Sequence, residues 1–368
     1  MKDKKYYYSF DSIKGISIFI VCICGHFWQF TPAEYWASGK YVWAVNMTNA
    51  VTHFAFQTYP VMELLFMISG FQMFASYNKI ADGEEPFGQY LWRKVQRIFP
   101  LTILGTLLIA VGGLIYEGIT GELWYDVSVT GTYLVENLLN IQSWVNVKHT
   151  LNGPLWYISV YFFCLLLFYF LCRIGKKTGL DLWVMLIPVL LGLYYSNRNM
   201  EVLLMNNDMA RGYLGFFFGV LIAGLSEKIK GKAVRKLNVI SAVMIILWFI
   251  MRYPLKEHLY GSLQDQVVVS MLFLFTPVLL VLANNERLDR IVGNKWLAYI
   301  GKISFSMYVL NIPFCMWILI IDKAFKWNLP YQMDYMFWIT SVIQVYLATL
   351  VYRFFEKPVY KKLKTIGK

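Results

Sequence analysis

Long runs of apolar residues, separated by short polar and basic stretches, recur along most of the chain. Ile103–Ile115, Leu155–Cys172 and Met271–Ala283 are three of the longest. Because a bilayer-spanning helix needs roughly 20 mostly apolar residues, this pattern predicts many membrane spans rather than one buried core. We place about ten spans near residues 13–30, 51–76, 99–117, 154–172, 182–196, 210–226, 238–252, 265–283, 302–321 and 335–355.

The pattern therefore predicts an all-α polytopic membrane protein, with residues 1–368 forming a single domain. The first apolar segment runs through His26 into Phe27 without a small-residue cleavage site, so we expect it to remain as the first helix. Two segments between spans, near 31–50 and 117–153, are rich in Trp, Tyr and Asn. They are too long for minimal turns, and we expect them to cover the outer face.

Composition agrees with this reading, because 58% of the residues are hydrophobic and only 15% are charged. The net charge of +12 would suit a nucleic-acid surface, but its distribution favours a membrane. Of 34 lysines and arginines, 26 fall in the two tails (counted through Lys14 and from Arg353) and in the alternate loops at 77–98, 173–181, 227–237 and 284–302. Basic residues are retained on the cytoplasmic side of membranes, which predicts cytoplasmic termini, contact with lipid headgroups, no nucleic-acid partner and a multi-pass protein of the inner membrane.

Ionisable residues within the spans are the first candidates for function, because burying them in lipid is costly. Asp11 and Lys14 lie at the cytoplasmic mouth of the first predicted helix, and His26 lies about 18 Å further along it. A neutral imidazole can take a proton from a hydroxyl, although a lone histidine in a helix can also be a packing residue. Glu63 is the one acidic residue well inside a predicted span, and we expect a cation on another helix, His26 or Lys14, to pair with it.

Further polar stretches follow at the ends of other predicted spans. Arg93, Lys94 and Arg97 share a helix face at the cytoplasmic end of the third span, where they suit phosphate groups or act as ordinary membrane anchors. Ser69 and its neighbouring glycine, and the outer helix start containing Asn152, Trp156 and Tyr157, suit either substrate binding or helix packing. The five cysteines lie in predicted spans without metal-ligand spacing, so we expect packing thiols and no metal site.

These stretches occur in an order that resembles the acyltransferase-3 family of bacterial membrane O-acyltransferases. The segment at the first predicted helix contains an Asp, a Lys and a His. The segment around Ser69 contains Ser-Gly-Phe, the one that begins at Arg93 reads Arg-x-x-x-Arg-Ile-Phe-Pro, and the one that begins at Pro154 reads Pro-Leu-Trp. The seven matching segments are Phe10–His26, Leu65–Phe71, Arg93–Pro100, Pro154–Ser159, Arg211–Gly219, Ile303–Pro313 and Tyr352–Pro358. The chain is similar to the stand-alone members that have no esterase-like domain.

The resemblance implies that an acyl group, most often acetyl, passes from cytoplasmic acyl-CoA to a hydroxyl of a cell-surface or lipid-linked glycan, with no permanently bound cofactor. It implies that His26 is the general base or a transient acyl carrier and that Glu63 orients or charge-balances it, with Asp11 and Lys14 in support. Arg93, Lys94 and Arg97 would hold the donor's phosphates. The acceptor would contact Ser69, Asn152, Trp156, Tyr157 and Arg211.

The chain departs from the family pattern at three places. Eleven residues separate Lys14 from His26 where the family commonly has ten, so either a bulge near Gly25 aligns the pair or Lys14 is not the working cation. Val160 and Tyr161 stand where a Glu often follows the Trp segment, and Asn311 replaces a His. Two other function classes remain open: a transporter or flippase with a His26–Glu63 proton relay, and a non-catalytic partner of a glycan-assembly complex.

Overall fold

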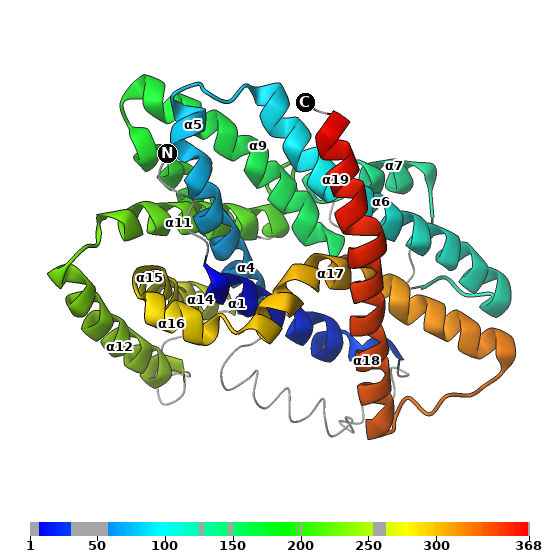
Figure 1. Ribbon diagram of the computed structural model, residues 1–368. Coiled ribbons are helices and arrows are strands. Elements are labelled where there is room, and N and C mark those ends of the chain that lie inside the picture. Colours follow the sequence, from blue (N-terminus) through cyan, green and yellow to red (C-terminus); the bar gives the residue numbers. More distant parts are fainter. Residues whose placement is uncertain are drawn as a thin grey trace. The chain divides into compact units, whose positions relative to one another are not determined.

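The computed structural model (Figure 1) describes residues 7–30, 58–124, 129–145, 150–196, 198, 201–252 and 263–366. Within these ranges the chain is helical and contains no β-strand, only an isolated bridge between Val202 and Met205. The predicted outer segment at 31–50 lies outside the described residues, as does part of the one at 117–153. The all-α class predicted from the hydrophobic pattern is confirmed for the described residues.

Eight helical segments of the described chain are long and apolar enough to cross a membrane. They are Tyr8–Gly25, Phe87–Thr120, Leu155–Thr178, Asn207–Lys228, Lys232–Arg252, Asp265–Asn284, Lys295–Phe325 and Asp334–Ile366. The two other predicted spans correspond to the 16-residue helix α4 (Thr58–Met73) and to the shorter apolar segment Asp181–Ser196. The protein is therefore a multi-pass membrane protein.

The chain divides into two compact units. Unit 1 contains Met1–Lys14, Tyr59–Phe87 and Val160–Tyr299, and unit 2 contains Gly15–Thr58, Gly88–Ser159 and Ile300–Lys368. Three of the five boundaries fall within the helices α1 (Tyr8–Phe19), α9 (Leu155–Thr178) and α17 (Lys295–Phe325), and the other two fall directly after the first residues of α4 and of α6 (Phe87–Thr120).

Unit 1 is built around a close crossing of α4 and α11 (Asn207–Lys228). A Cβ at Gly70 would overlap the backbone carbonyl of Phe216, and a Cβ at Gly219 would overlap the backbone of Met67. Small residues at such a crossing let two helix backbones approach, as is common between membrane helices. The packing role foreseen for the Ser-Gly pair on α4 is thus confirmed for Gly70.

The rest of unit 1 packs around this pair of helices. Trp248 donates to the Ser270 hydroxyl at 3.1 Å, and Asn284 donates to Ser226 at 2.9 Å, which joins three further helical segments to one another and to α11. Its other elements are η3 (Phe74–Ser76), α5 (Tyr77–Ala81), η6 (Asp181–Met185), α10 (Leu186–Ser196), α12 (Lys232–Arg252), α14 (Leu263–Ser270), η7 (Met271–Phe275), α15 (Thr276–Asn284) and α16 (Glu286–Val292).

Unit 2 is organised around α17. A Cβ at Gly15 would lie only 2.6 Å from the backbone nitrogen of Gly301, so α1 and α17 touch backbone to backbone there. Both helices continue from this point in the same direction, because His26 and Asn311 meet again further along. Its other elements are η1 (Ile20–Gly25), η2 (Phe27–Phe30), α6 (Phe87–Thr120), α7 (Gly131–Leu138), α8 (Gln142–Val145), α18 (Asp334–Val351), η8 (Tyr352–Glu356) and α19 (Lys357–Ile366).

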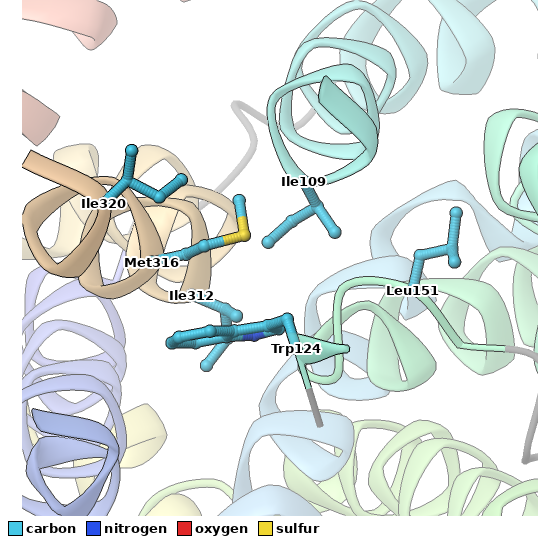
Figure 2. Packing of buried hydrophobic residues seen from close by; sticks show 6 residues of the cluster. All are labelled: Ile109, Trp124, Leu151, Ile312, Met316 and Ile320. Carbon is cyan, nitrogen blue, oxygen red and sulfur yellow. The ribbon is translucent and has the colours of Figure 1, made fainter. Parts of the chain in front are cut away.

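An apolar cluster holds α6 against α17 within unit 2 (Figure 2). Ile109 of α6 packs with Ile312, Met316 and Ile320 of α17, and Trp124 and Leu151 complete the cluster. All six residues are at most 8% exposed, so they form a dry contact. Because lipid tails are as apolar as these side chains, the cluster stabilises the helix pair through close van der Waals contact rather than through removal of apolar surface from water. The cluster fixes α17 relative to α6.

Two helices of unit 2 exceed the thickness of a bilayer. The 34 residues of α6 span about 51 Å, and α18, η8 and α19 continue one another over a 33-residue segment (Figure 1). The hydrocarbon core is only about 30 Å thick. Since Gln96 of α6 donates to the carbonyl of Leu363 on α19 at 2.9 Å, the two polar ends lie together.

Candidate active site

His26 lies directly after a turn of π-helix that ends the first membrane helix. The segment Ile20–Gly25 is π-helical, and His26 follows it as the C-cap. The ring is partly buried, whereas Cys22 and Phe27 around it are at most 2% exposed. A single π turn takes up one extra residue, and such turns are frequent at functional sites. A bulge, one of the two alternatives that the Lys14–His26 spacing left open, is therefore present.

Residue counting on the two neighbouring helices shows what the π turn accomplishes. From Gly15 to His26 the first helix uses eleven residues, whereas from Gly301 to Asn311 α17 uses ten. Gly15 touches Gly301 at one end of this stretch, and His26 bonds to Asn311 at the other. The first helix must therefore accommodate its extra residue between these two contacts. Without the π turn, His26 would be rotated by about 100° away from Asn311.

Asn311 is the residue of α17 that holds His26. Its Oδ1 is hydrogen bonded to His26 Nδ1, and its Nδ2 donates to the carbonyl of Cys22 at 2.9 Å. Asn311 itself is fully buried. It thus ties the histidine and the backbone of the π turn to one point on α17.

The same face of α17 contacts two other segments singled out in the sequence. Tyr308 donates to the carbonyl of Pro154 at 2.6 Å, and Asn152 donates to the carbonyl of Val309 at 2.9 Å. Ser306, one turn earlier, donates to Glu356 at 2.5 Å. Segments that are far apart in the chain therefore meet along a few turns of one helix.

The neighbouring residues predicted to bind the acceptor, Tyr157 and Trp156, pack close to these contacts. Tyr157 is 7% exposed and packs edge-on against Tyr308, with ring centroids 5.9 Å apart. Trp156 is partly exposed and packs edge-on against Tyr157. In this part of the chain the packing role is visible in the structure, and the binding role remains a prediction.

The basic cluster predicted on the third span lies on the protruding end of α6. Arg93 and Arg97 are exposed, whereas Lys94 is partly buried and lies over the Tyr90 ring at 5.0 Å. Glu356 is close enough to Arg97 for the two charges to interact, and its carboxylate also accepts from Ser306. Arg97 is therefore held near a carboxylate of η8, a neighbour that sequence reasoning did not identify.

Lysines of α19 extend this basic surface. Lys357, Lys361 and Lys364 are exposed and spaced so that they share one face, next to the less exposed stripe containing Leu363. Because Gln96 bonds to the Leu363 carbonyl, the C-terminal end of α19 lies beside the end of α6 that carries Arg93 and Arg97. The sequence showed these lysines only as part of a basic tail.

Glu63 has an ion-pair partner within unit 1, and it is Arg211. The Arg211 Nε donates to Glu63 Oε1 at 2.5 Å, and both side chains are at most 8% exposed. The prediction that His26 or Lys14 would pair with Glu63 was wrong, because the close α4–α11 crossing brings Arg211 to it instead. Asp208, one helical turn before Arg211, interacts electrostatically with both.

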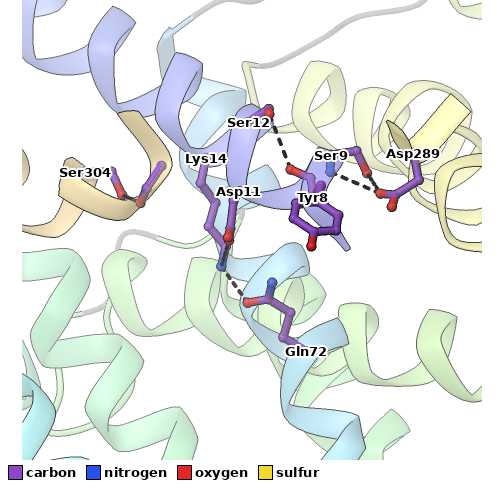
Figure 3. Close-up of polar contacts among 9 residues, drawn as sticks. Tyr8, Ser9, Asp11, Ser12, Lys14, Gln72, Asp289 and Ser304 are labelled. Carbon is purple, nitrogen blue, oxygen red and sulfur yellow. Dashed lines mark hydrogen bonds and ion pairs between the residues drawn. The ribbon is translucent and has the colours of Figure 1, made fainter. Parts of the chain in front are cut away.

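Lys14 and Asp11 form a separate polar group in unit 1 (Figure 3). Lys14 Nζ donates to Gln72 Oε1 at 2.5 Å and lies 3.9 Å from Asp11 Oδ1. Nearby, the Ser9 hydroxyl donates to Asp289 at 2.5 Å, which anchors the start of α1 to α16. Ser69, one turn before Gln72 on α4, is partly exposed. Among the described residues, no group of histidines, cysteines and carboxylates is arranged to hold a metal ion.

Comparison with known families decides the class of the protein. The acyltransferase domain of the acyltransferase-3 family matches residues 7–354, which is nearly the whole chain. The chain belongs to the acyltransferase-3 family. Comparison with curated proteins and with solved structures finds no significant match. This acyltransferase is thus an integral membrane member of its family, and the resemblance noted from seven short motifs is confirmed.

Proposed function

We propose that this acyltransferase moves an acyl group, most often acetyl, from cytoplasmic acyl-CoA to a hydroxyl of a cell-surface or lipid-linked glycan. The observation that carries the proposal is the position of His26. It is a partly exposed imidazole, held by Asn311, in the same unit as the basic end of α6. An imidazole in such a place can serve as general base, and a basic surface suits the phosphates of a coenzyme.

His26 moves one proton in the proposed reaction. The acceptor's hydroxyl oxygen attacks the thioester carbonyl as His26 takes the hydroxyl proton. A carbon–oxygen bond forms and the carbon–sulfur bond breaks, which leaves an ester on the acceptor and a thiolate on the coenzyme. The protonated imidazole then returns its proton to the thiolate, so the histidine ends in its starting state. General base catalysis of this kind contributes typically 10²–10⁴-fold.

We assign the donor's phosphates to the exposed cations on the N-terminal end of α6 and on α19. Arg93 and Arg97 supply planar guanidinium groups that bind phosphate in a bidentate manner. The lysines of α19 supply point charges beside them. Lys94 is assigned a smaller role, because its ammonium lies over Tyr90.

The residues that we assign to acceptor binding come from each of the two units. In unit 2, Asn152 lies just before α9, and Trp156 and Tyr157 lie in its first turn. In unit 1, Arg211 lies in the first turns of α11, where Glu63 holds its guanidinium in place. We therefore assign Glu63 to positioning Arg211. Ser69 of α4, directly before Gly70 at the crossing with α11, completes the proposed acceptor residues.

In the proposed topology the chain crosses the inner membrane about ten times, and both termini lie in the cytoplasm. Its support is the distribution of charge, since 26 of the 34 basic residues fall on one side of such an arrangement. The protruding ends of α6 and α19 lie on that same side. Membrane lipids and the glycan are the proposed partners, and acyl-CoA is the proposed co-substrate.

Transfer of a radiolabelled acetyl group by the purified protein tests this function. Acetyl-CoA is incubated with the protein in nanodiscs and with lipid-linked or soluble glycans from the producing cell envelope. Label that reaches the glycan and is released by mild base supports O-acyl transfer. Transport of the glycan without transfer of label would instead support the flippase reading, and neither activity would support a non-catalytic role.

A further inference from the structure

Asn311 determines which ring nitrogen of His26 carries the proton in the neutral imidazole. A side-chain amide has one end that only accepts and one that only donates. The carbonyl of Cys22 can only accept, so the end of Asn311 that reaches it at 2.9 Å must be the Nδ2 amide. The opposite end, which meets His26 Nδ1, is therefore the Oδ1 acceptor.

An acceptor at this position requires a donor on the histidine. Nδ1 of His26 must carry a hydrogen to bond with Asn311 Oδ1. In the neutral ring the other nitrogen, Nε2, then has no hydrogen and carries the basic lone pair. Free imidazole side chains prefer the opposite tautomer, so the protein selects the less common form.

We propose that Asn311 is a positioning residue that holds His26 as the Nδ1–H tautomer and thereby makes Nε2 the base. The catalytic half of this inference rests on the proposed function. The π turn is part of the arrangement, because it both turns His26 towards α17 and provides the Cys22 carbonyl that orients the Asn311 amide. The orientation of a catalytic histidine by a hydrogen bond to its second nitrogen is a general device in enzymes.

Asn311→Leu and Asn311→Asp separate orientation from packing. Leucine has a similar size and removes both hydrogen bonds, whereas aspartate keeps an acceptor oxygen for His26 Nδ1. Ser304→Ala is the matched control on the same helix, since within the described part of the chain the Ser304 hydroxyl donates to the Gly301 carbonyl of its own helix, one turn away.

The tautomer is read by ¹⁵N NMR of histidine-labelled protein in nanodiscs. The chain has four histidines, and the His26 signals are assigned as those lost in His26→Gln. We expect the Nδ1–H form in the wild type, in Asn311→Asp and in Ser304→Ala, and a shift to the Nε2–H form in Asn311→Leu. In acyl transfer, we expect Asn311→Leu to lower kcat by about tenfold at nearly constant KM, equal to about 1.4 kcal/mol, and aspartate to recover most of it.

Several results would overturn the inference. An Nε2–H form in the wild type, or an Nδ1–H form that survives in Asn311→Leu, would show that Asn311 does not set the tautomer. A changed tautomer with unchanged kcat would show that the tautomer does not matter for transfer. If the wild type transferred no acyl group, the proposed function and the catalytic half would fail, and the NMR result would still decide the structural half.

Discussion

Removal of one member of the Glu63–Arg211 ion pair should destabilise the protein strongly, and the two removals should differ in size. Both side chains are buried, with a 2.5 Å bond between them. Loss of one partner in a buried pair leaves an uncompensated charge and costs about 3–5 kcal/mol. Arg211→Met leaves two carboxylates, Glu63 and Asp208, without their shared cation, so we expect about 5 kcal/mol. Glu63→Gln leaves Arg211 facing Asp208, so we expect about 3 kcal/mol.

The double variant Glu63→Gln/Arg211→Met gives the strongest test of this reasoning. It removes both charges together, so its cost should fall below the sum of the single costs by at least about 2 kcal/mol. The free energy of unfolding is measured by chemical unfolding in mixed micelles. Asp82→Asn is the control, because Asp82 pairs with Lys176 at 3.1 Å where both side chains are about half exposed, and its effect should be much smaller. Additive costs, or a larger cost for Glu63→Gln than for Arg211→Met, would refute the argument.

Three further predictions concern the donor site and the orientation in the membrane. Arg97→Ala should raise the KM for acetyl-CoA by about tenfold or more, because charge-assisted bonds contribute roughly 1.5–3 kcal/mol; an unchanged donor KM with a raised acceptor KM would contradict the layout. Lys361→Ala/Lys364→Ala should bring acetyl-CoA and acetyl-dephospho-CoA to the same KM if these lysines bind the 3′-phosphate, whereas an equal loss for both donors would indicate a lipid anchor. In Asp82→Cys, the new thiol should react with impermeant thiol reagents only after the cytoplasmic face is opened. In Asp126→Cys, at a position outside the described residues, the thiol should react in intact cells once any outer barrier is permeabilised. Labelling of Asp82→Cys from outside would invert the proposed topology.

Local periodicity and spacing predicted much of this fold. The apolar runs predicted the helical membrane architecture, because lipid requires each span to satisfy its own backbone hydrogen bonds. The extra residue between Lys14 and His26 left a bulge or a different working cation open, and the π turn Ile20–Gly25 supplies a bulge. Both inferences depend only on residues that are close together in the chain.

Partners across the chain could not be predicted in the same way. Burial of Glu63 required a cation, but Arg211 lies 148 positions away and reaches Glu63 only because glycines let α4 and α11 cross closely. Likewise, Asn311 looked like the loss of a family histidine, whereas the structure shows it bonded to His26. Such pairs depend on which helices pack together and in which register, and one sequence does not contain that information in a local pattern.

Acetyl transfer by wild-type and His26→Ala protein tests the central claim most directly. Both proteins are purified in nanodiscs, checked for equal folding by their unfolding curves, and incubated with labelled acetyl-CoA and the same glycan acceptor. We expect base-labile label on the glycan with the wild type and a loss of transfer of at least about 100-fold with His26→Ala, since the base has been removed. Near-normal turnover by His26→Ala would contradict the assignment of His26, and with it the mechanism proposed for this acyltransferase.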